Sequence, residues 1–183
     1  MSELSVGQLS GLTVNSNVIT VPSGHKLYAP GHVLQVVSAT KTDTFAMSSS
    51  TFTDIPSLSA TITPSSTSSK IYVSVTMLTG QATASTATHF RLVRDSTAIG
   101  IGDAAGSRIR ISSSTYAANN NESMPTAITF LDSPSTTSAS TYKVQMASVL
   151  NGNQSVINRS NGDPDNTNSG RSISTITLME IAQ

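Results

Sequence analysis

The 183-residue sequence contains no cysteine and no tryptophan, and only 11% of its residues are charged. Without cysteine, disulfides and thiolate metal sites are excluded. Ten acidic and ten basic residues give a formal net charge of zero, whereas nucleic-acid binding normally requires a basic surface. The composition therefore predicts no nucleic-acid partner. Aromatic residues are also scarce, at 4% of the chain.

Sequence signals for secretion and membrane insertion are also missing. Residues 1–11, MSELSVGQLSG, have neither the basic n-region nor the apolar h-region of a signal peptide. No apolar stretch approaches the length needed to span a bilayer. We therefore expect a protein that is synthesised in a cytosol and has no membrane partner.

Groups suited to catalysis are scarce. The chain has three histidines, His25, His32 and His89, and no G-x-S-x-G nucleophile elbow. No acidic pair stands out as an acid and base, so we expect no enzymatic activity, no catalytic residues and no cofactor. His25 and His32, seven residues apart, could ring a threefold axis around a metal, but an ordinary surface or interface histidine is the simpler interpretation.

Serine and threonine are abundant and supply roughly a third of the positions. The apolar residues are largely β-branched and form short runs, and the net charge is zero, which together argue against disorder. This composition favours a β-rich fold with a small core in each subunit, which gains further burial by association.

Eight segments carry the period-two alternation of β-strands. In the clearest, residues 69–78, the side chains of Ile71, Val73, Val75 and Met77 fall on one face. The eight expected strands span residues 32–41, 52–64, 69–78, 88–95, 107–113, 127–132, 141–150 and 174–183. We predict an all-β protein with a single β-sandwich, of jelly-roll type, whose last strand is central or at an interface.

Residues 1–31 differ from the rest because they have too few apolar residues for a core. We interpret them as an extended N-terminal arm for attachment and assembly, ending at the Pro30–Gly31 turn. Residues 32–183 then form the head domain. The expected attachment residues of the arm are Val14, Val18, Ile19, Val21, Leu27 and Tyr28.

Three segments are predicted loops: residues 100–106, 119–121 and 158–172. The third is long and polar, as functional or disordered loops are. Its side chains can hydrogen-bond sugar hydroxyls, which makes it a candidate receptor-facing loop, although no aromatic platform accompanies it. The candidate residues are Asn158, Arg159, Asn161, Asp163, Asp165, Asn166 and Asn168.

Two other interpretations of this loop remain open. The stretch from Asp163 to Asn168 loosely resembles a calcium loop, but Ser174 stands where an EF-hand has its bidentate glutamate. A polar loop shaped by Asx-turns is the simpler alternative. We predict no metal site.

Arginines on neighbouring expected strands can pair with aspartates across a subunit interface, or form weak pairs on a solvated sheet face. The arginines are Arg91, Arg94, Arg108 and Arg110, and the aspartates are Asp95, Asp103 and Asp132.

Three longer strings carry a family resemblance. PGHVLQVVSATKTDTF, FTDIPSLSATITPSSTSSKIYV and FLDSPSTTSASTYKVQ resemble a module of tail-fibre-like and other virion structural proteins of marine and freshwater phages, including cyanophages. VITVPSGHKLYAPG resembles the linker that precedes this module. The resemblance runs from about residue 14 to the end of the chain.

The resemblance implies a homo-oligomer, a trimer in such fibres, at the virion surface, synthesised in the cytoplasm of a host bacterium. The sequence shows no long shaft or tail-anchoring domain before the module, which favours a capsid decoration, cement or short head-fibre protein. Its partners are then other virion proteins, either the major capsid protein or tail and fibre components. The alternative is a tail-fibre or adsorption protein that binds a host surface glycan through its distal loops.

Overall fold

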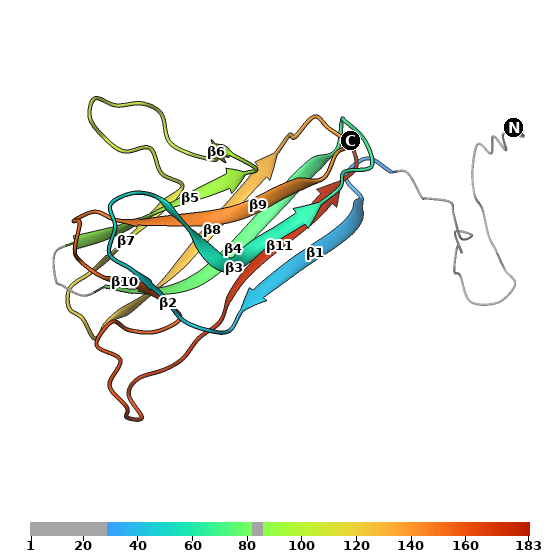
Figure 1. Ribbon diagram of the computed structural model, residues 1–183. Coiled ribbons are helices and arrows are strands. Elements are labelled where there is room, and N and C mark those ends of the chain that lie inside the picture. Colours follow the sequence, from blue (N-terminus) through green and yellow to red (C-terminus); the bar gives the residue numbers. More distant parts are fainter. Residues whose placement is uncertain (1–28, 82–85) are drawn as a thin grey trace, which may run out of the picture.

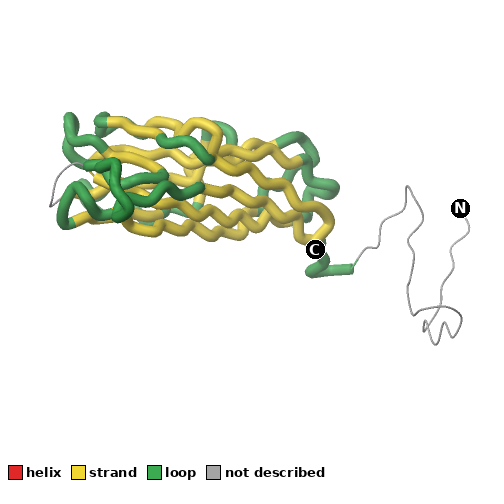
Figure 2. Tube along the Cα trace, turned by 90° about the horizontal axis from the view of Figure 1, so that it is seen from below, coloured by secondary structure: helices red, strands yellow, loops and turns green. Residues whose placement is uncertain are grey.

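The structure, a computed structural model, describes residues 29–81 and 86–183. This part of the chain is all-β, without a helix, as Figure 2 shows, and so includes no helix long and apolar enough to cross a membrane. The strands are β1 (Val33–Lys41), β2 (Phe45–Met47), β3 (Thr53–Ile62), β4 (Lys70–Gln81), β5 (Thr86–Arg94), β6 (Thr97–Ile99), β7 (Ser113–Ala117), β8 (Ser123–Asp132), β9 (Ser140–Ser148), β10 (Ser155–Ile157) and β11 (Ser174–Ile181).

The strands form two antiparallel sheets that pack face to face (Figure 1). Sheet A has the order β1-β11-β4-β8, with the short strands β10 and β2 continuing from one end of β4. Sheet B has the order β3-β9-β5, with β6 and β7 along the outer edge of β5. The eight strands of five or more residues are β1, β3, β4, β5, β7, β8, β9 and β11. Counted along the chain, sheet A holds the first, eighth, third and sixth of them, in the order β1-β11-β4-β8. Sheet B holds the second, seventh, fourth and fifth, in the order β3-β9-β5-β7. This order is that of a jelly roll, so the predicted β-sandwich and its topology are confirmed.

Alternating apolar residues from both sheets form the core. Ile71, Val73 and Val75 of β4 are fully buried, and Phe90 and Leu92 of β5 face them from the other sheet. The alternation is interrupted in β3, where Ile55 and Leu58 both face inward although they are three residues apart. A bulge between them absorbs the extra residue: Ser57 has a φ of 64° and the register with β9 shifts there.

One predicted strand is wrong. Residues 107–113 alternate isoleucine with arginine, but residues 107–112 belong to a loop that runs from Gly100 to Ser112, and Ser113 begins β7. Hydrogen bonds within the loop hold its shape. The Arg110 Nε donates to the Gly102 carbonyl at 2.6 Å, and the Gly102 amide donates to the Ile111 carbonyl at 3.3 Å. Ile109 stays 53% exposed, so the isoleucines do not face a core.

Four strands had no prediction. β2, β6 and β10 have three residues each, too few for alternation to be recognised, and β7 reads SSTYA, which is mostly polar. The other seven predicted strands are present, and β11 is central, between β1 and β4. The predicted loops at residues 119–121 and 158–172 are also confirmed.

A largely buried polar triad links the two sheets and pairs an arginine with an aspartate within one subunit, which neither of the two interpretations of these residues anticipated. Asp132 of sheet A accepts hydrogen bonds from Arg94 at 2.6 Å and from the hydroxyl of Tyr142 at 2.7 Å, both in sheet B. Burial raises the pKa of Tyr142, and the hydrogen bond to Asp132 raises it further. Arg94 and Asp132 are therefore used within one subunit. Arg91, Arg108 and Arg110 donate to loop carbonyls, and Asp95 accepts from the Thr141 amide.

A second buried network, built from hydroxyls and an amide, lies at the other end of the sandwich. The Gln81 side chain of β4 donates to the Thr88 hydroxyl at 2.8 Å and accepts from the Ala117 amide at 3.0 Å. Thr88 in turn bonds Ser155 of β10. Uncharged groups thus satisfy one another across the sheets, as the low charge content of the chain requires.

The described chain begins at a turn. The His32 amide donates to the Ala29 carbonyl at 3.0 Å, and Gly31 has a φ of 82°, which fits a type II turn with Pro30 and Gly31 at its centre. The Gly31 amide donates to the Ala182 carbonyl at 2.8 Å and the Ala182 amide to the His32 carbonyl at 2.9 Å. The start of the described chain is therefore tied to its end.

Candidate functional site: the loop between β10 and β11

The long polar loop lies at the end of the sandwich opposite to Ala29, the first described residue, and Gln183. β1 and β11 are antiparallel, with Lys41 opposite Ser174 and Val33 opposite Ile181. Residues 158–173 come directly before Ser174, so they emerge beside Lys41, whereas Ala29 and Gln183 lie beyond Val33 and Ile181 (Figure 1). Eight strand residues separate the two ends by about 25 Å.

Asn158 forms the base of the loop and does not face a receptor, which corrects its predicted role. Its side chain is fully buried. The Nδ2 group donates to the carbonyls of Lys41 at 3.0 Å and Asp43 at 2.8 Å, and the Oδ1 atom accepts from the Ser174 hydroxyl at 2.7 Å. Its φ of 66° lies in the left-handed region, which asparagine tolerates better than most residues.

The loop packs closely on the end of β4. A Cβ atom on Gly80 would lie 2.7 Å from the Arg159 carbonyl oxygen and 2.9 Å from the Asn161 amide nitrogen. Only glycine permits this approach of two backbones. On its other side the loop contacts the turn between β7 and β8, because the Gly162 amide donates to the Asn120 carbonyl at 2.8 Å.

Arg159 and Asn161 organise the first part of the loop. The Arg159 guanidinium is largely buried and donates to the carbonyls of Ser160 at 3.1 Å and Asn161 at 3.0 Å. The Asn161 Oδ1 atom is buried without a hydrogen-bond partner within the described chain. These two predicted site residues therefore shape the loop, and they are less available to a ligand than its tip.

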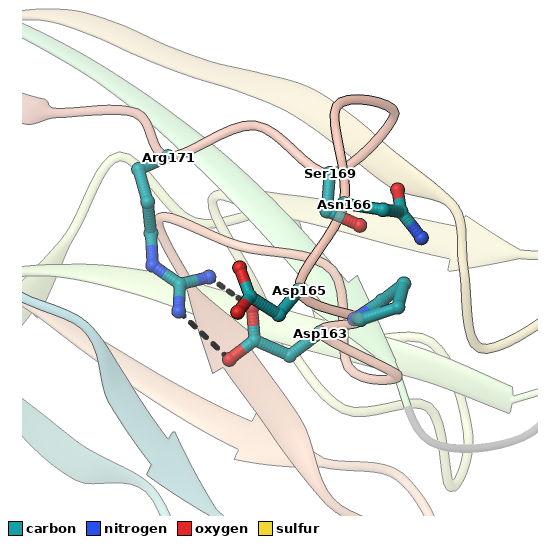
Figure 3. A pocket seen from close by; sticks show the side chains of 6 residues that line it. Asp163, Asp165, Asn166, Ser169 and Arg171 are labelled. Carbon is teal, nitrogen blue, oxygen red and sulfur yellow. Dashed lines mark hydrogen bonds and ion pairs between the residues drawn. The ribbon is translucent and has the colours of Figure 1, made fainter.

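The tip of the loop surrounds a polar hollow of about 300 Å³ (Figure 3). Its walls are Asp163, Pro164, Asp165, Asn166, Ser169 and Arg171. Arg171 forms a bidentate ion pair with the Asp163 carboxylate. Its Nη1 group donates to Oδ1, and its Nη2 group donates to Oδ2 at 2.9 Å. The hydrogen bond from Arg171 holds the pKa of Asp163 below its usual range, and the positive charges of Arg171 and Arg159 act in the same direction.

Asx-type bonds define the remainder of the tip. The Asn166 Oδ1 atom accepts from the Asn168 amide at 2.9 Å, and the Asn166 carbonyl accepts from the Ser169 amide. Asp165, Asn166 and Asn168 are exposed. The tip thus offers carboxylate, amide, hydroxyl and guanidinium groups, which suit a ligand rich in hydroxyls.

The calcium interpretation does not fit this arrangement. Arg171, a cation of the chain itself, occupies the Asp163 carboxylate, and Ser174 is buried against Asn158. Among the described residues, no group of three or more histidines and acidic side chains is placed to hold a metal.

The other predicted site residues are not part of this cluster. The attachment residues Val14, Val18, Ile19, Val21, Leu27 and Tyr28 lie outside the described residues, as does His25. His32 is exposed at the turn that precedes β1.

Arg171 and Gly80 were missed by the sequence reasoning. Arg171 belongs to the predicted loop segment and is its only basic residue besides Arg159, so its position eight residues after Asp163 in the same loop was a usable signal. Gly80 lies in an otherwise regular strand, where an isolated glycine often marks close approach of another backbone.

Comparisons with known proteins add little to this description. No known protein family and no curated protein matches the sequence. Among solved structures, the chain aligns with a structure of the infectious bursal disease virus Gx strain (TM-score 0.45, 10% identity) and with a crystal structure of the VP2 subviral particle of that virus (TM-score 0.40, 11% identity).

Each alignment covers 91% of this chain but only 41% and 43% of the viral chains. The chain thus spans less than half the length of these structures. At such TM-scores the similarity carries no argument about function, and the assignment of the jelly roll rests on the strand order.

Proposed function

We propose that this chain is a non-enzymatic structural protein of a phage particle, a decoration or cement protein of the capsid or a short head fibre. It acts as a homo-oligomer, a trimer, at the virion surface after synthesis in the cytoplasm of the host bacterium. The arm, residues 1–31, attaches it to the major capsid protein, and residues 32–183 form the exposed head.

The observation that carries this proposal is that the two ends of the domain differ. Residues 29–32 and the C-terminal strand are joined at one end, and the long polar loop lies at the other (Figure 1). The tip of this loop surrounds the hollow of Figure 3. A domain held at one end by a segment outside its core presents its opposite end to solvent. This arrangement suits a protein that is anchored to a large particle and projects from it.

The fold and the sequence resemblance support the same proposal. Jelly rolls occur in viral capsid domains and in lectins, but many functions share such a fold, so topology alone assigns none. The resemblance of most of the chain to phage structural modules supports the virion among these functions.

A second candidate function is favoured by the hollow at the loop tip. An adsorption or tail-fibre protein would use Asp165, Asn166 and Ser169, beside the Asp163–Arg171 pair, to bind hydroxyls of a host surface glycan. Its location would be the tail or tail tip and its anchor a tail or fibre component, so the position of the protein on the particle separates the two candidates.

Removing residues 1–28 tests the attachment role. This deletion keeps the Ala29–His32 turn and its bonds to Ala182, so we expect the shortened protein to remain folded. Purified full-length and shortened proteins are added to particles that lack the protein, and bound protein is measured after the particles are pelleted. We expect the full chain to bind and the shortened chain to stay in the supernatant.

Circular dichroism and thermal unfolding of the shortened protein serve as the control. A shortened protein that is folded and still pellets with particles would show that attachment does not use the arm. If it unfolds, residues 1–28 belong to the folded domain, and the division into arm and head is wrong.

A further inference from the structure

An apolar row crosses the outer face of sheet A, one residue from each main strand. Val36 of β1 lies opposite Met179 of β11, Met179 opposite Tyr72 of β4, and Tyr72 opposite Leu131 of β8. Val36 is 56% and Leu131 47% exposed, and Tyr72 and Met179 are half-buried. These four residues, here called the apolar row, point away from the core because their strand neighbours point into it.

In the described strands, the rest of this face carries a single charge, that of Lys70. Beside the row, Val33 lies opposite Ile181. Farther along the strands, apart from Leu78 and Pro125, the outward residues are small and mostly hydroxylated: Ser38, Thr40, Ser74, Thr76, Ala127, Thr129, Thr175 and Thr177. Along the described strands β1, β11, β4 and β8, Lys70 is the one outward side chain with a charge.

The outer face of sheet B is different. It carries an ion pair between Lys143 and Asp54 at 2.7 Å, and Arg91 lies 3.8 Å from the centre of the Phe52 ring. Charged residues are depleted at the centres of protein interfaces, and exposed apolar patches often mark them. The contrast between the two faces therefore identifies sheet A as the face suited to a protein contact.

Charge and size both favour a second copy of this chain as the occupant. An almost uncharged face can meet its own copy without the like-charge repulsion that excludes wrong partners. Four strands about 4.8 Å apart and nine residues long present roughly 500 Å² of flat surface. Two copies would then bury roughly 1,000 Å² in total, the lower bound of a specific interface.

The path of the chain gives an independent reason. Residues 1–28 leave the domain at Ala29, and the Gly31–Ala182 and Ala182–His32 bonds hold this point beside Ile181 and Val33. If neighbouring copies meet through this face with their strands running in the same direction, the points at which these segments begin lie side by side. This arrangement would let all copies attach to one particle.

We propose that the outer face of sheet A, centred on Val36, Tyr72, Leu131 and Met179, is the surface through which copies of this chain associate. The inference names the interface of the oligomer in the proposed function and rests on that function for the role of residues 1–28. The oligomeric state in solution tests it directly.

The experiment measures the mass of the full chain by sedimentation velocity over a range of concentrations. We expect the wild type to sediment as an oligomer and the double variant Val36→Lys/Leu131→Lys as a monomer of 19.0 kDa. The matched control is Leu150→Lys/Ile173→Lys, at positions that are 52% and 54% exposed but lie outside the strands of the sheet. The control should keep the wild-type mass, and circular dichroism should show all three proteins folded.

Two results would overturn the inference. A double variant that keeps the oligomeric mass would place the interface elsewhere, and a wild type that is monomeric throughout would remove the interface altogether. Antibody labelling of particles distinguishes these failures from failure of the virion role, because a monomeric protein that still labels the particle contradicts only the inference about the interface.

Discussion

Replacing Glu180 with alanine should lower the free energy of unfolding by about 3–5 kcal/mol. Glu180 is fully buried in the central strand β11. Its carboxylate accepts four hydrogen bonds: from the Ser65 amide at 2.7 Å and hydroxyl at 2.6 Å, from the Ser69 hydroxyl at 2.7 Å, and from the Gln35 Nε2 group at 2.6 Å. Alanine at this position would leave a cavity, and the four donors would lose their acceptor. Chemical denaturation measures the change.

Glu122→Ala is the matched control. Glu122 accepts two hydrogen bonds, from the Ala118 amide and the Asn119 side chain. Both bonds lie in the exposed turn between β7 and β8. Its loss should cost below about 1 kcal/mol. A cost for Glu180→Ala as small as that of the control would contradict the structural role assigned to the buried carboxylate.

The same carboxylate makes stability depend on pH. Burial alone would raise the pKa of Glu180, but the bonds from Ser65, Ser69 and Gln35 outweigh it and hold the pKa below the ordinary value. A group whose pKa is depressed by folding stabilises the fold above its unfolded pKa, about 4.3 for glutamate. That contribution is lost as the pH falls through the lower folded value.

The wild type should therefore lose more stability than Glu180→Gln between neutral pH and about pH 3. Asp54 and Asp163 also have lowered pKa values, so the difference between the two proteins, and not either curve alone, reports Glu180. Parallel curves of unfolding free energy against pH would contradict the assignment.

Asn158→Ala is expected to destabilise the protein by about 3–5 kcal/mol and to loosen the candidate loop. Alanine would free the buried carbonyls of Lys41 and Asp43 and the Ser174 hydroxyl. It would also place a Cβ-bearing residue without local hydrogen bonds at a φ of 66°. Thermal unfolding measures the loss, and hydrogen exchange at the Ser172 amide, which donates to the Asn158 carbonyl, reports the loop.

Two further variants separate the causes. Asn158→Gly keeps the left-handed backbone accessible and should recover about 1 kcal/mol of the loss. Asn166→Ala removes an exposed Asx bond at the loop tip and should change stability by less than about 1 kcal/mol. Equal effects of Asn158→Ala and Asn166→Ala would mean that the buried base does not hold the loop.

The sequence predicted the sandwich because the long strands alternate without ambiguity. Residues 69–78 place Ile71, Val73 and Val75 on one face, and all three are fully buried. Residues 107–113 show the same alternation, yet residues 107–112 belong to a loop held by Arg110 and Gly102. Period-two patterning is a local signal and does not report whether a partner strand exists.

Local sequence patterns could not predict the hydrogen-bond partners of the buried polar groups. Alternation in β11 places position 180 inside, but the donors that make a glutamate acceptable there lie at least 111 residues away along the chain. Asn158 likewise reads as one of several asparagines in a polar loop, and only the approach of Lys41 and Asp43 makes it structural. The exposure of the loop tip, in contrast, was predictable, because Asp165, Asn166 and Asn168 belong to a long polar segment with no apolar side chain to bury.

Gold-labelled antibody imaging of intact particles tests the central proposal most directly. An antibody against the loop tip, residues 163–171, would bind the end of the domain opposite to Ala29, where the described chain begins (Figure 1). The account predicts label distributed over the head of the particle. Label confined to the tail or its tip would contradict the decoration role in favour of adsorption, and particles without label would contradict a virion role altogether.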